Sequence, residues 1–393
     1  MSTQSRRGFI ELCGGPSASE SLRSNEESGP DRIVVVGGGI IGASIAYHLA
    51  RRGAQVVLCE KLRPASGATE KSFAWLNASF EKQPRHYYLL NALGISGWRR
   101  LQRELDDELQ IQWGGSVEWY PPGDQAEQLR RNVERRQAWG YPTHLADAPE
   151  FQRLLPNVSP GPLGVASFTE NEGTLNPARA VEVILKNAER RGAKILYPCD
   201  VTGFEFASGR IRAVQTSRGR FPADVVALAA GVDTPSLAAK LGVRVPLKDS
   251  SGVLVHKIVS DQILDHVVLA PGANIKQNPD GEIVTGANFG PSSLADRSSD
   301  NPGGPLLTGA ARFLPRLQNA TIDRVTVCWR PMPLDEYPIV GFAHGCPNLY
   351  IAAMHSGVTL SPLIGQLACL EILDKADVDL LQPYRLSRFA GAP

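Results

Sequence analysis

The sequence has almost no excess of charge of either sign, and it has no long apolar run. Its 41 lysines and arginines are matched by 40 aspartates and glutamates, which leaves a net charge of +1 at pH 7. A chain without a basic or acidic surplus offers no extended surface for nucleic acid or for an anionic membrane. No apolar run reaches about 18 residues, so we expect no membrane span.

Metal-binding and disulfide patterns are also missing. The six cysteines include no C-x-x-C pair, and the seven histidines form no cluster at metal-ligand spacing. This argues against a zinc site, so we expect no metal, and it argues against the disulfide framework of a small secreted protein. Most of the thiols should be buried and reduced; they are Cys13, Cys59, Cys199, Cys328, Cys346 and Cys369.

The first thirty residues differ from the rest of the chain. The string SRRGFI at 5–10 resembles the start of a twin-arginine export signal. Export requires an apolar region next, but the polar string ELCGGPSASESLRSNEESGP follows. We therefore interpret residues 1–30 as a disordered tail and expect a cytoplasmic protein.

The most informative stretch is residues 33–60, IVVVGGGIIGASIAYHLARRGAQVVLCE. Its pattern predicts strand, glycine turn, helix and strand, in that order. Gly37, Gly39 and Gly42 fit the G-x-G-x-x-G spacing. The first allows the tight turn, the second lets the backbone approach a pyrophosphate, and the third lets the helix pack on the strand. The stretch therefore predicts a dinucleotide site.

The flanks of the glycine turn complete this site. Unpaired N–H groups at the helix start, near Ile40 and Ile41, suit phosphate oxygens. Glu60 ends the second strand, where a carboxylate can accept hydrogen bonds from an adenosine ribose. The following loop, KLRPASGATEK, is rich in small and hydroxyl residues that let a backbone touch a ligand. We count these loop residues among the cofactor contacts: Lys61, Ser66, Gly67, Ala68 and Thr69.

The rest of the chain is predicted to be α/β (α+β) in alternating pieces. Helical periodicity covers 87–109, 126–139 and 178–191, and strand patterns cover 111–120, 194–197, 201–206, 211–216 and 221–230. Residues 245–330 have the pattern of an antiparallel sheet, and the C-terminal part returns to strand, turn and helix. We therefore predict a discontinuous Rossmann-like domain of residues 31–85, 165–244 and 331–393. A mixed antiparallel-sheet substrate domain, 86–164 and 245–330, is inserted into it.

Four blocks of the chain resemble the D-amino-acid oxidase superfamily of flavoproteins, which includes glycine oxidase, sarcosine oxidase and D-amino-acid dehydrogenases. They are VVVGGGIIGASIAYHLARRGAQVVLCE, EGTLNPARAVEVILKNAERRGAKI, ADVVALAAGVDTPSL, and WRPMPLDEYPIVG with NLYIAAMHSGVTLSP. The resemblance implies FAD rather than NAD, and a substrate sheet over the flavin. It also implies hydride removal from a carbon that bears an amine or a hydroxyl.

A second glycine turn precedes the C-terminal helix. A helix N-terminus near the N1–C2=O edge of a flavin would stabilise the reduced anion. The expected contacts here are Ser356, Gly357, Val358 and Thr359, and we add Val201, Ala230 and Gly231 to the cofactor site.

Two residues are the catalytic candidates. In amino-acid-oxidising members of the superfamily, an arginine in the motif that holds Arg330 clamps the substrate carboxylate, and a guanidinium can do so bidentately. The alternative is a structural arginine paired with Asp335 or Glu336. His355 is a candidate for a hydrogen bond to substrate or flavin, or for a base near neutral pH; the alternative is a packing histidine.

Cys328 and two lysines bear on whether the flavin is covalently attached and on whether the enzyme is an oxidase or a dehydrogenase. CWRPMPLDE resembles the sarcosine oxidase segment whose cysteine bonds to the flavin, but the residues between cysteine and LDE differ, and Thr359 stands at about the place of a carboxylate-binding lysine. We therefore favour non-covalent FAD, with a link through Cys328 as the alternative. No lysine near EIVTG matches the oxygen-activating lysine, which favours a dehydrogenase, although Lys257 and Lys276 remain candidates for the pocket.

The sequence thus predicts an FAD-dependent oxidoreductase that oxidises the C–N bond of an amino acid or secondary amine to an imine. The electrons then pass to oxygen or another acceptor. Oxidation of a 2-hydroxy acid fits Arg330 equally well. A non-catalytic FAD-binding subunit of a larger oxidoreductase complex is the third alternative, and the presence of both Arg330 and His355 argues against it.

Overall fold

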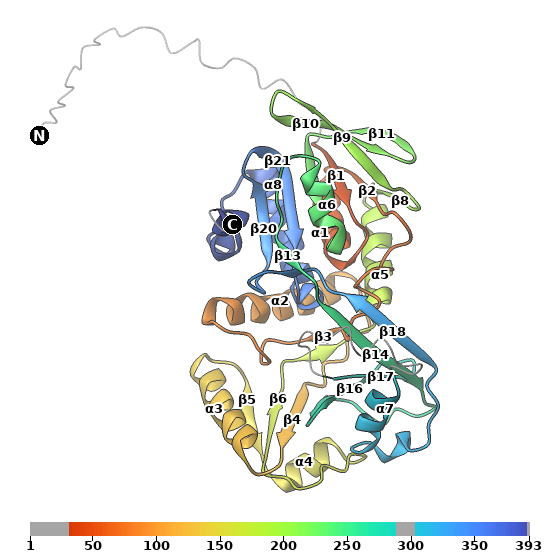
Figure 1. The fold of residues 1–393 in the computed structure, drawn as a ribbon, viewed down its shortest axis with the longest axis vertical. Helices are drawn as coiled ribbons and strands as arrows, with labels where there is room; N and C mark the ends of the chain where they lie inside the picture. Colours follow the sequence, from red (N-terminus) through yellow and green to blue (C-terminus); the bar gives the residue numbers. More distant parts are fainter. Residues whose placement is uncertain (1–30, 288–302, 391–393) are drawn as a thin grey trace, which may run out of the picture.

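The protein is built around two sheets, one above the other in Figure 1. The computed structural model describes residues 31–287 and 303–390. The predicted tail at 1–30, with Cys13, lies outside these residues.

The upper, six-stranded sheet contains the N-terminal fingerprint. Its strand order is β20-β21-β12-β1-β2-β8, and all neighbours are parallel except β20 and β21. The strands are β1 (Arg32–Val36), β2 (Gln55–Cys59), β8 (Lys194–Leu196), β12 (Val225–Leu228), β20 (Ile339–Ala343) and β21 (Cys346–Ala353). Parallel strands need crossovers on the sheet faces, and their near-continuous apolar sequences reflect burial on both faces.

Two different layers cover this sheet. Helices pack on one face: α1 (Ile40–Arg51), α5 (Pro177–Glu189) and α8 (Gly357–Asp374), with α2 (Arg85–Glu104) beyond them. On the other face lie the three-stranded sheet β9 (Val201–Ala207), β10 (Arg210–Thr216), β11 (Gly219–Pro222) and the short helix α6 (Thr234–Ala239). The predicted discontinuous Rossmann-like architecture is thus present.

The lower, eight-stranded sheet is antiparallel except where β15 meets β4. Its order is β18-β14-β17-β16-β15-β4-β6-β5. The strands are β4 (Ser116–Tyr120), β5 (Thr143–Ala146), β6 (Val165–Thr169), β14 (Ser251–Ile258), β15 (Val267–Ala270), β16 (Ala273–Gln277), β17 (Glu282–Gly286) and β18 (Arg324–Trp329). The helices at this end are α3 (Asp124–Ala138), α4 (Ala148–Leu154) and α7 (Gly304–Ala311). Two-stranded pairs join the halves: β3 (Trp75–Leu76) with β7 (Gly173–Thr174), and β13 (Leu247–Lys248) with β19 (Met332–Pro333).

Two segments lie on the other side of the predicted domain boundaries. β6, which the prediction placed in the Rossmann-like domain, pairs with β4 and β5 in the lower sheet. Helix α2, predicted for the substrate domain, packs on α8, where the Trp98 indole N–H donates to Val358 O at 2.7 Å. Both differences concern packing between segments that are distant in sequence. Local periodicity does not specify such packing.

Two expected elements are shorter than predicted. The helix expected over 87–109 ends at Glu104, because Asp106 and Asp107 adopt positive φ. The strand expected over 111–120 begins only at Ser116. A Cβ at Gly114 would lie 1.7 Å from Asp265 O, so Gly114 serves a close backbone approach instead.

Helix α8 is, within the described residues, the one helix long and apolar enough to cross a membrane by length and composition. Two thirds of it (67%) is buried inside the protein, and it carries the buried polar residues Ser361 and Glu371. These features are those of a core helix.

Candidate active site

A cavity of about 1480 Å³ lies between the two sheets. It is larger than the roughly 300–1000 Å³ of ordinary small-molecule pockets, and so has room for a dinucleotide together with a substrate. With the exception of Gly42, every residue predicted to bind the cofactor or to act in catalysis lines it. The lining set is Gly37, Gly39, Ile40, Ile41, Glu60, Lys61, Ser66, Gly67, Ala68, Thr69, Val201, Ala230, Gly231, Arg330, His355, Ser356, Gly357, Val358 and Thr359.

The exception is Gly42, which lies in α1 and packs against the backbone of the glycine turn. A Cβ at Gly42 would lie 2.0 Å from Gly37 O, so only glycine lets α1 start this close to β1. Gly37 has φ of +108°, and a Cβ there would lie 2.4 Å from Ala229 O. These two positions keep the turn tight and leave its backbone open to a ligand.

The polar groups around this turn are already ordered. Glu60 accepts hydrogen bonds from Gly38 N at 2.8 Å and from Leu62 N at 2.9 Å, so its carboxylate is held at the end of β2. A carboxylate has further lone pairs, and these can accept ribose hydroxyls. Thr69 Oγ1 accepts from Ile40 N at 3.1 Å, which ties the loop to the start of α1. Lys61 pairs with Asp233 at 2.5 Å.

A second helix N-terminus enters the cavity at α8. The first intrahelical bond runs from Leu360 N to Ser356 O, so the N–H groups of Gly357, Val358 and Thr359 precede the helical ladder. Ser356 has φ of +57°, and its hydroxyl accepts from Lys82 Nζ and Tyr87 OH. The Thr359 hydroxyl instead bonds to β3, donating to Trp75 O at 3.1 Å. Only the backbone of Thr359 is left to contact a cofactor.

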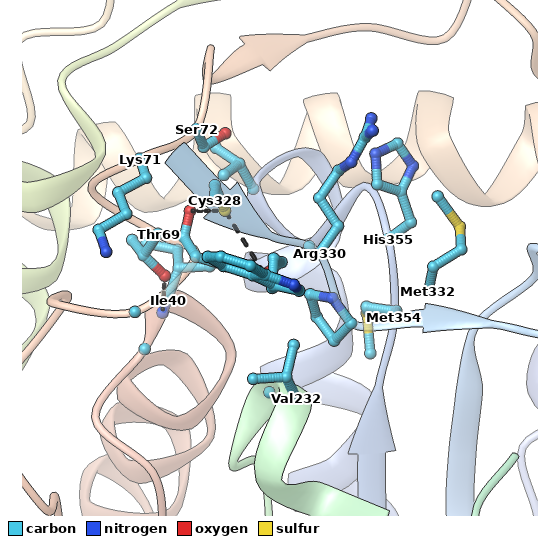
Figure 2. Close-up of a pocket in the computed structure, with 18 of the residues that line it drawn as sticks. Ile40, Thr69, Lys71, Ser72, Val232, Cys328, Arg330, Met332, Met354 and His355 are labelled. Carbon is cyan, nitrogen blue, oxygen red and sulfur yellow. Dashed lines mark hydrogen bonds between the residues drawn. The ribbon is translucent and has the colours of Figure 1, made fainter. Parts of the chain in front are cut away.

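Arg330 lines the cavity at the end of β18 (Figure 2). The two acids considered as alternative partners of Arg330 pair with other residues, Asp335 with Arg388 at 2.7 Å and Glu336 with Lys248 at 2.7 Å. The Arg330 guanidinium lies against Gly252, and its Nη2 donates to Ser251 O at 2.5 Å. Burial lowers the pKa of Arg330. A half-buried guanidinium held by backbone is suited to bind a carboxylate.

His355 lies beside Arg330 in Figure 2. Burial, together with the charges of Lys82 and Arg330, lowers the pKa of His355 to about 3. The imidazole is therefore neutral at physiological pH and a poor proton acceptor. This argues against the predicted role as a base near pH 7 and leaves His355 as a hydrogen-bonding group.

Cys328 faces the loop that follows the fingerprint. Its thiol donates to Ala68 O at 3.8 Å and to Trp329 O at 3.4 Å, and burial raises the pKa of Cys328 to about 11. The reactive form of a cysteine is the thiolate, so at neutral pH this thiol is a poor nucleophile towards a flavin methyl group.

The two lysines suggested for the pocket do not line it. Lys257 pairs with Asp323 at 3.0 Å. Lys276 is fully buried behind Phe73, 5.9 Å from the ring centroid, and donates to Thr174 Oγ1 and Leu175 O.

Sequence reasoning missed several polar residues of the cavity, and Lys82 and Asn274 are two of them. Lys82, from the loop before α2, contacts Ser356. Asn274, from β16, is 5% exposed, lines the cavity and pairs with Gly286 of β17 in the ladder. Neither belongs to a motif, so no local signal marked them.

Comparison with known proteins agrees with this geometry. Residues 32–369 match the family model DAO, FAD dependent oxidoreductase. Glycine oxidase of Pseudomonas putida is 26% identical over 353 residues, 86% of this chain and 93% of that protein. Human mitochondrial sarcosine dehydrogenase is 28% identical over 229 residues, 55% of this chain and 24% of that protein. The crystal structure of glycine oxidase from Geobacillus kaustophilus superposes with a TM-score of 0.81 at 24% identity, covering 91% of this chain and 99% of that one.

The chain is therefore an FAD-type oxidoreductase in both fold and site. It belongs to the FAD-dependent oxidoreductase family DAO, whose model matches residues 32–369. The glycine turn that a Cβ would fill, the fixed Glu60 and the second helix N-terminus fit FAD.

Proposed function

We propose that the protein removes a hydride from the carbon next to nitrogen in an amino acid or secondary amine, giving an imine that water hydrolyses. FAD, when bound, supplies the hydride acceptor at N5. The observation that carries the proposal is the position of the Arg330 guanidinium in the cavity that both helix N-termini enter. The names of the similar proteins, glycine oxidase and sarcosine dehydrogenase, support this substrate class.

The chain's own residues bind and orient the substrate in this reaction. Arg330 holds the carboxylate, which aligns the Cα–H bond for transfer. His355, neutral beside it, can donate or accept a hydrogen bond. A neutral amine needs no dedicated base, which agrees with the low pKa of His355. We further propose non-covalent FAD, because the Cys328 thiol is protonated. We also propose an electron acceptor other than oxygen, because Lys276 lies behind Phe73.

Anaerobic mixing with amino acids, N-methyl amino acids and 2-hydroxy acids tests the proposal. An amine substrate should bleach the flavin, and bleaching by hydroxy acids alone would refute it. In the variant Arg330→Lys, kcat/KM for the best carboxylate substrate should fall by about 10- to 100-fold, because a point ammonium replaces a bidentate fork. Unchanged kinetics would remove Arg330 from carboxylate binding. Repeating the reaction in air separates an oxidase from a dehydrogenase.

A further inference from the structure

Lys82 is a second cation in the cavity. It lies in the loop between β3 and α2, its side chain is only 7% exposed, and it lines the same cavity as Arg330 and His355. Its Nζ donates to Ser356 Oγ at 2.8 Å and lies 5.2 Å from the centroid of the Tyr87 ring. The catalytic scheme above gives this lysine no task.

The charge of Lys82 has no acidic partner in the part of the chain that the structure describes. No carboxylate oxygen of residues 31–287 or 303–390 lies within ion-pair distance of its Nζ. Among the acids that line the cavity, Asp233 pairs with Lys61 and Glu336 with Lys248, and the adjacent Glu81 forms no ion pair with Lys82. A buried ammonium without an anion is costly, so this arrangement suits a site that an anion completes.

The hydroxyl that Lys82 contacts does not fill this role. Ser356 Oγ is a neutral acceptor, and it also accepts from Tyr87 OH at 3.0 Å, which uses both of its lone pairs. An ammonium group carries three N–H donors. The Ser356 bond uses one and fixes the direction of the side chain, while the other donors remain for a ligand.

Lys82 and Arg330 act on the same end of the cavity. Both of their charges lower the pKa of His355, so both fields reach the same imidazole. Two cations around a neutral histidine match a ligand with two negative groups better than a ligand with one.

We propose that Lys82 binds a second acidic group of the substrate, so that the preferred substrates are dicarboxylic amines with one carboxylate at Arg330 and the other at Lys82. This inference rests on the proposed amine oxidation and adds the substrate class to it. It assigns to Lys82 a role in specificity, and none in the removal of the hydride.

Matched substrate pairs test this assignment on the flavin-loaded enzyme. The pairs are iminodiacetate with N-methylglycine, aspartate with 2-aminobutyrate, and glutamate with norvaline, as separate enantiomers where these exist. The wild type should prefer the dicarboxylate in the pair that it oxidises best. In Lys82→Met, kcat/KM for that dicarboxylate should fall by about 10- to 100-fold, with little change for its monocarboxylate partner. Lys82→Arg should restore most of the preference.

The control is Lys248→Met, which removes a cavity-lining lysine whose charge Glu336 already neutralises. In this control, the ratio of kcat/KM for the dicarboxylate to kcat/KM for its monocarboxylate partner should equal that of the wild type. Equal losses for both members of a pair in Lys82→Met, together with a shifted flavin midpoint potential, would overturn the inference, because Lys82 would then act on the flavin.

Binding of unreactive analogues keeps the inference testable if Lys82→Met does not fold or if no amine is oxidised. Thiodiacetate and methylthioacetate carry sulfur in place of the amine nitrogen and cannot form an imine. Thiodiacetate should perturb the flavin spectrum of the wild type at a concentration at least about tenfold lower than methylthioacetate does. Equal affinity would refute the role of Lys82, whereas the absence of flavin bleaching by any amine would refute only the proposed function.

Discussion

Because Lys276 is buried, the free energy of unfolding should fall as the pH falls from 10.5 to 7. The substitution Lys276→Met should remove this contribution. Lys276 is fully buried, and burial lowers its pKa from 10.5 to about 7, although Glu282 raises it in part. Well above pH 10.5 the side chain is neutral in both the folded and the unfolded protein, so its burial carries no charge penalty. As the pH falls towards 7, the unfolded chain takes up a proton that the folded protein does not, and the folded state loses stability.

The magnitude follows from the two pKa values. At pH 7 the penalty is roughly 4 kcal/mol relative to a lysine with the same pKa in both states. Lys276→Met removes this penalty but leaves Leu175 O without its donor, which costs about 1–3 kcal/mol. Thr174 Oγ1 keeps its own bond to Ala74 O. The variant should therefore be more stable than the wild type at pH 7, by about 1–3 kcal/mol, and less stable at pH 10.5 by a similar amount.

Urea unfolding with saturating FAD, at half-unit steps from pH 7 to 10.5, measures this difference. The difference between the two proteins cancels the titration of all other groups. Lys257→Met is the control, because Lys257 lies on β14 of the same sheet, is partly exposed and pairs with Asp323. The difference in free energy of unfolding between Lys257→Met and the wild type should vary little between pH 7 and pH 10.5. A stability difference for Lys276→Met that does not change sign with pH would refute the argument.

Two further predictions concern the cofactor. Gly42→Ala should yield protein with little bound FAD and at least about tenfold weaker FAD affinity, because the new Cβ would meet Gly37 O at 2.0 Å; Gly309→Ala, where a Cβ meets nothing within 4 Å, is the control for flavin content. Cys328→Ser should keep its full flavin content, and acid should release the flavin from both this variant and the wild type, because the thiol is protonated at neutral pH. Colour that stays in the acid pellet of the wild type alone would establish a covalent link.

The cofactor site could be predicted from the sequence because its geometry is local. The fingerprint at 33–60 specifies a turn that only glycine can form, and the structure places Gly37, Gly39 and Glu60 around one end of the cavity. The C-terminal turn at Ser356 and Gly357 was found for the same reason, since a strand, a turn and a helix follow each other directly in the chain.

The substrate side could be predicted only in part because its contacts are distant in sequence. Lys82 meets Ser356 across 274 residues, and nothing in the string around Lys82 indicates that pairing. Residues 165–169 fall within the predicted Rossmann-like domain but form β6 of the lower sheet, because nothing in their own sequence specifies their pairing with β4 and β5. His355 was recognised as a cavity residue, but its low pKa depends on burial and on two cations brought from other segments.

The cofactor cavity is closed by the two ends of the described chain. Its walls include the turn at Gly37 and the turn at Gly357, and α1 and α8 pack so closely that Ser44 Oγ donates to Ser361 O at 2.7 Å. During synthesis, the flavin site cannot form until β21 and α8 have left the ribosome. Residues as far as Asp374 must therefore be synthesised before the complete site can form, and flavin content should report how many chains have brought the two turns together.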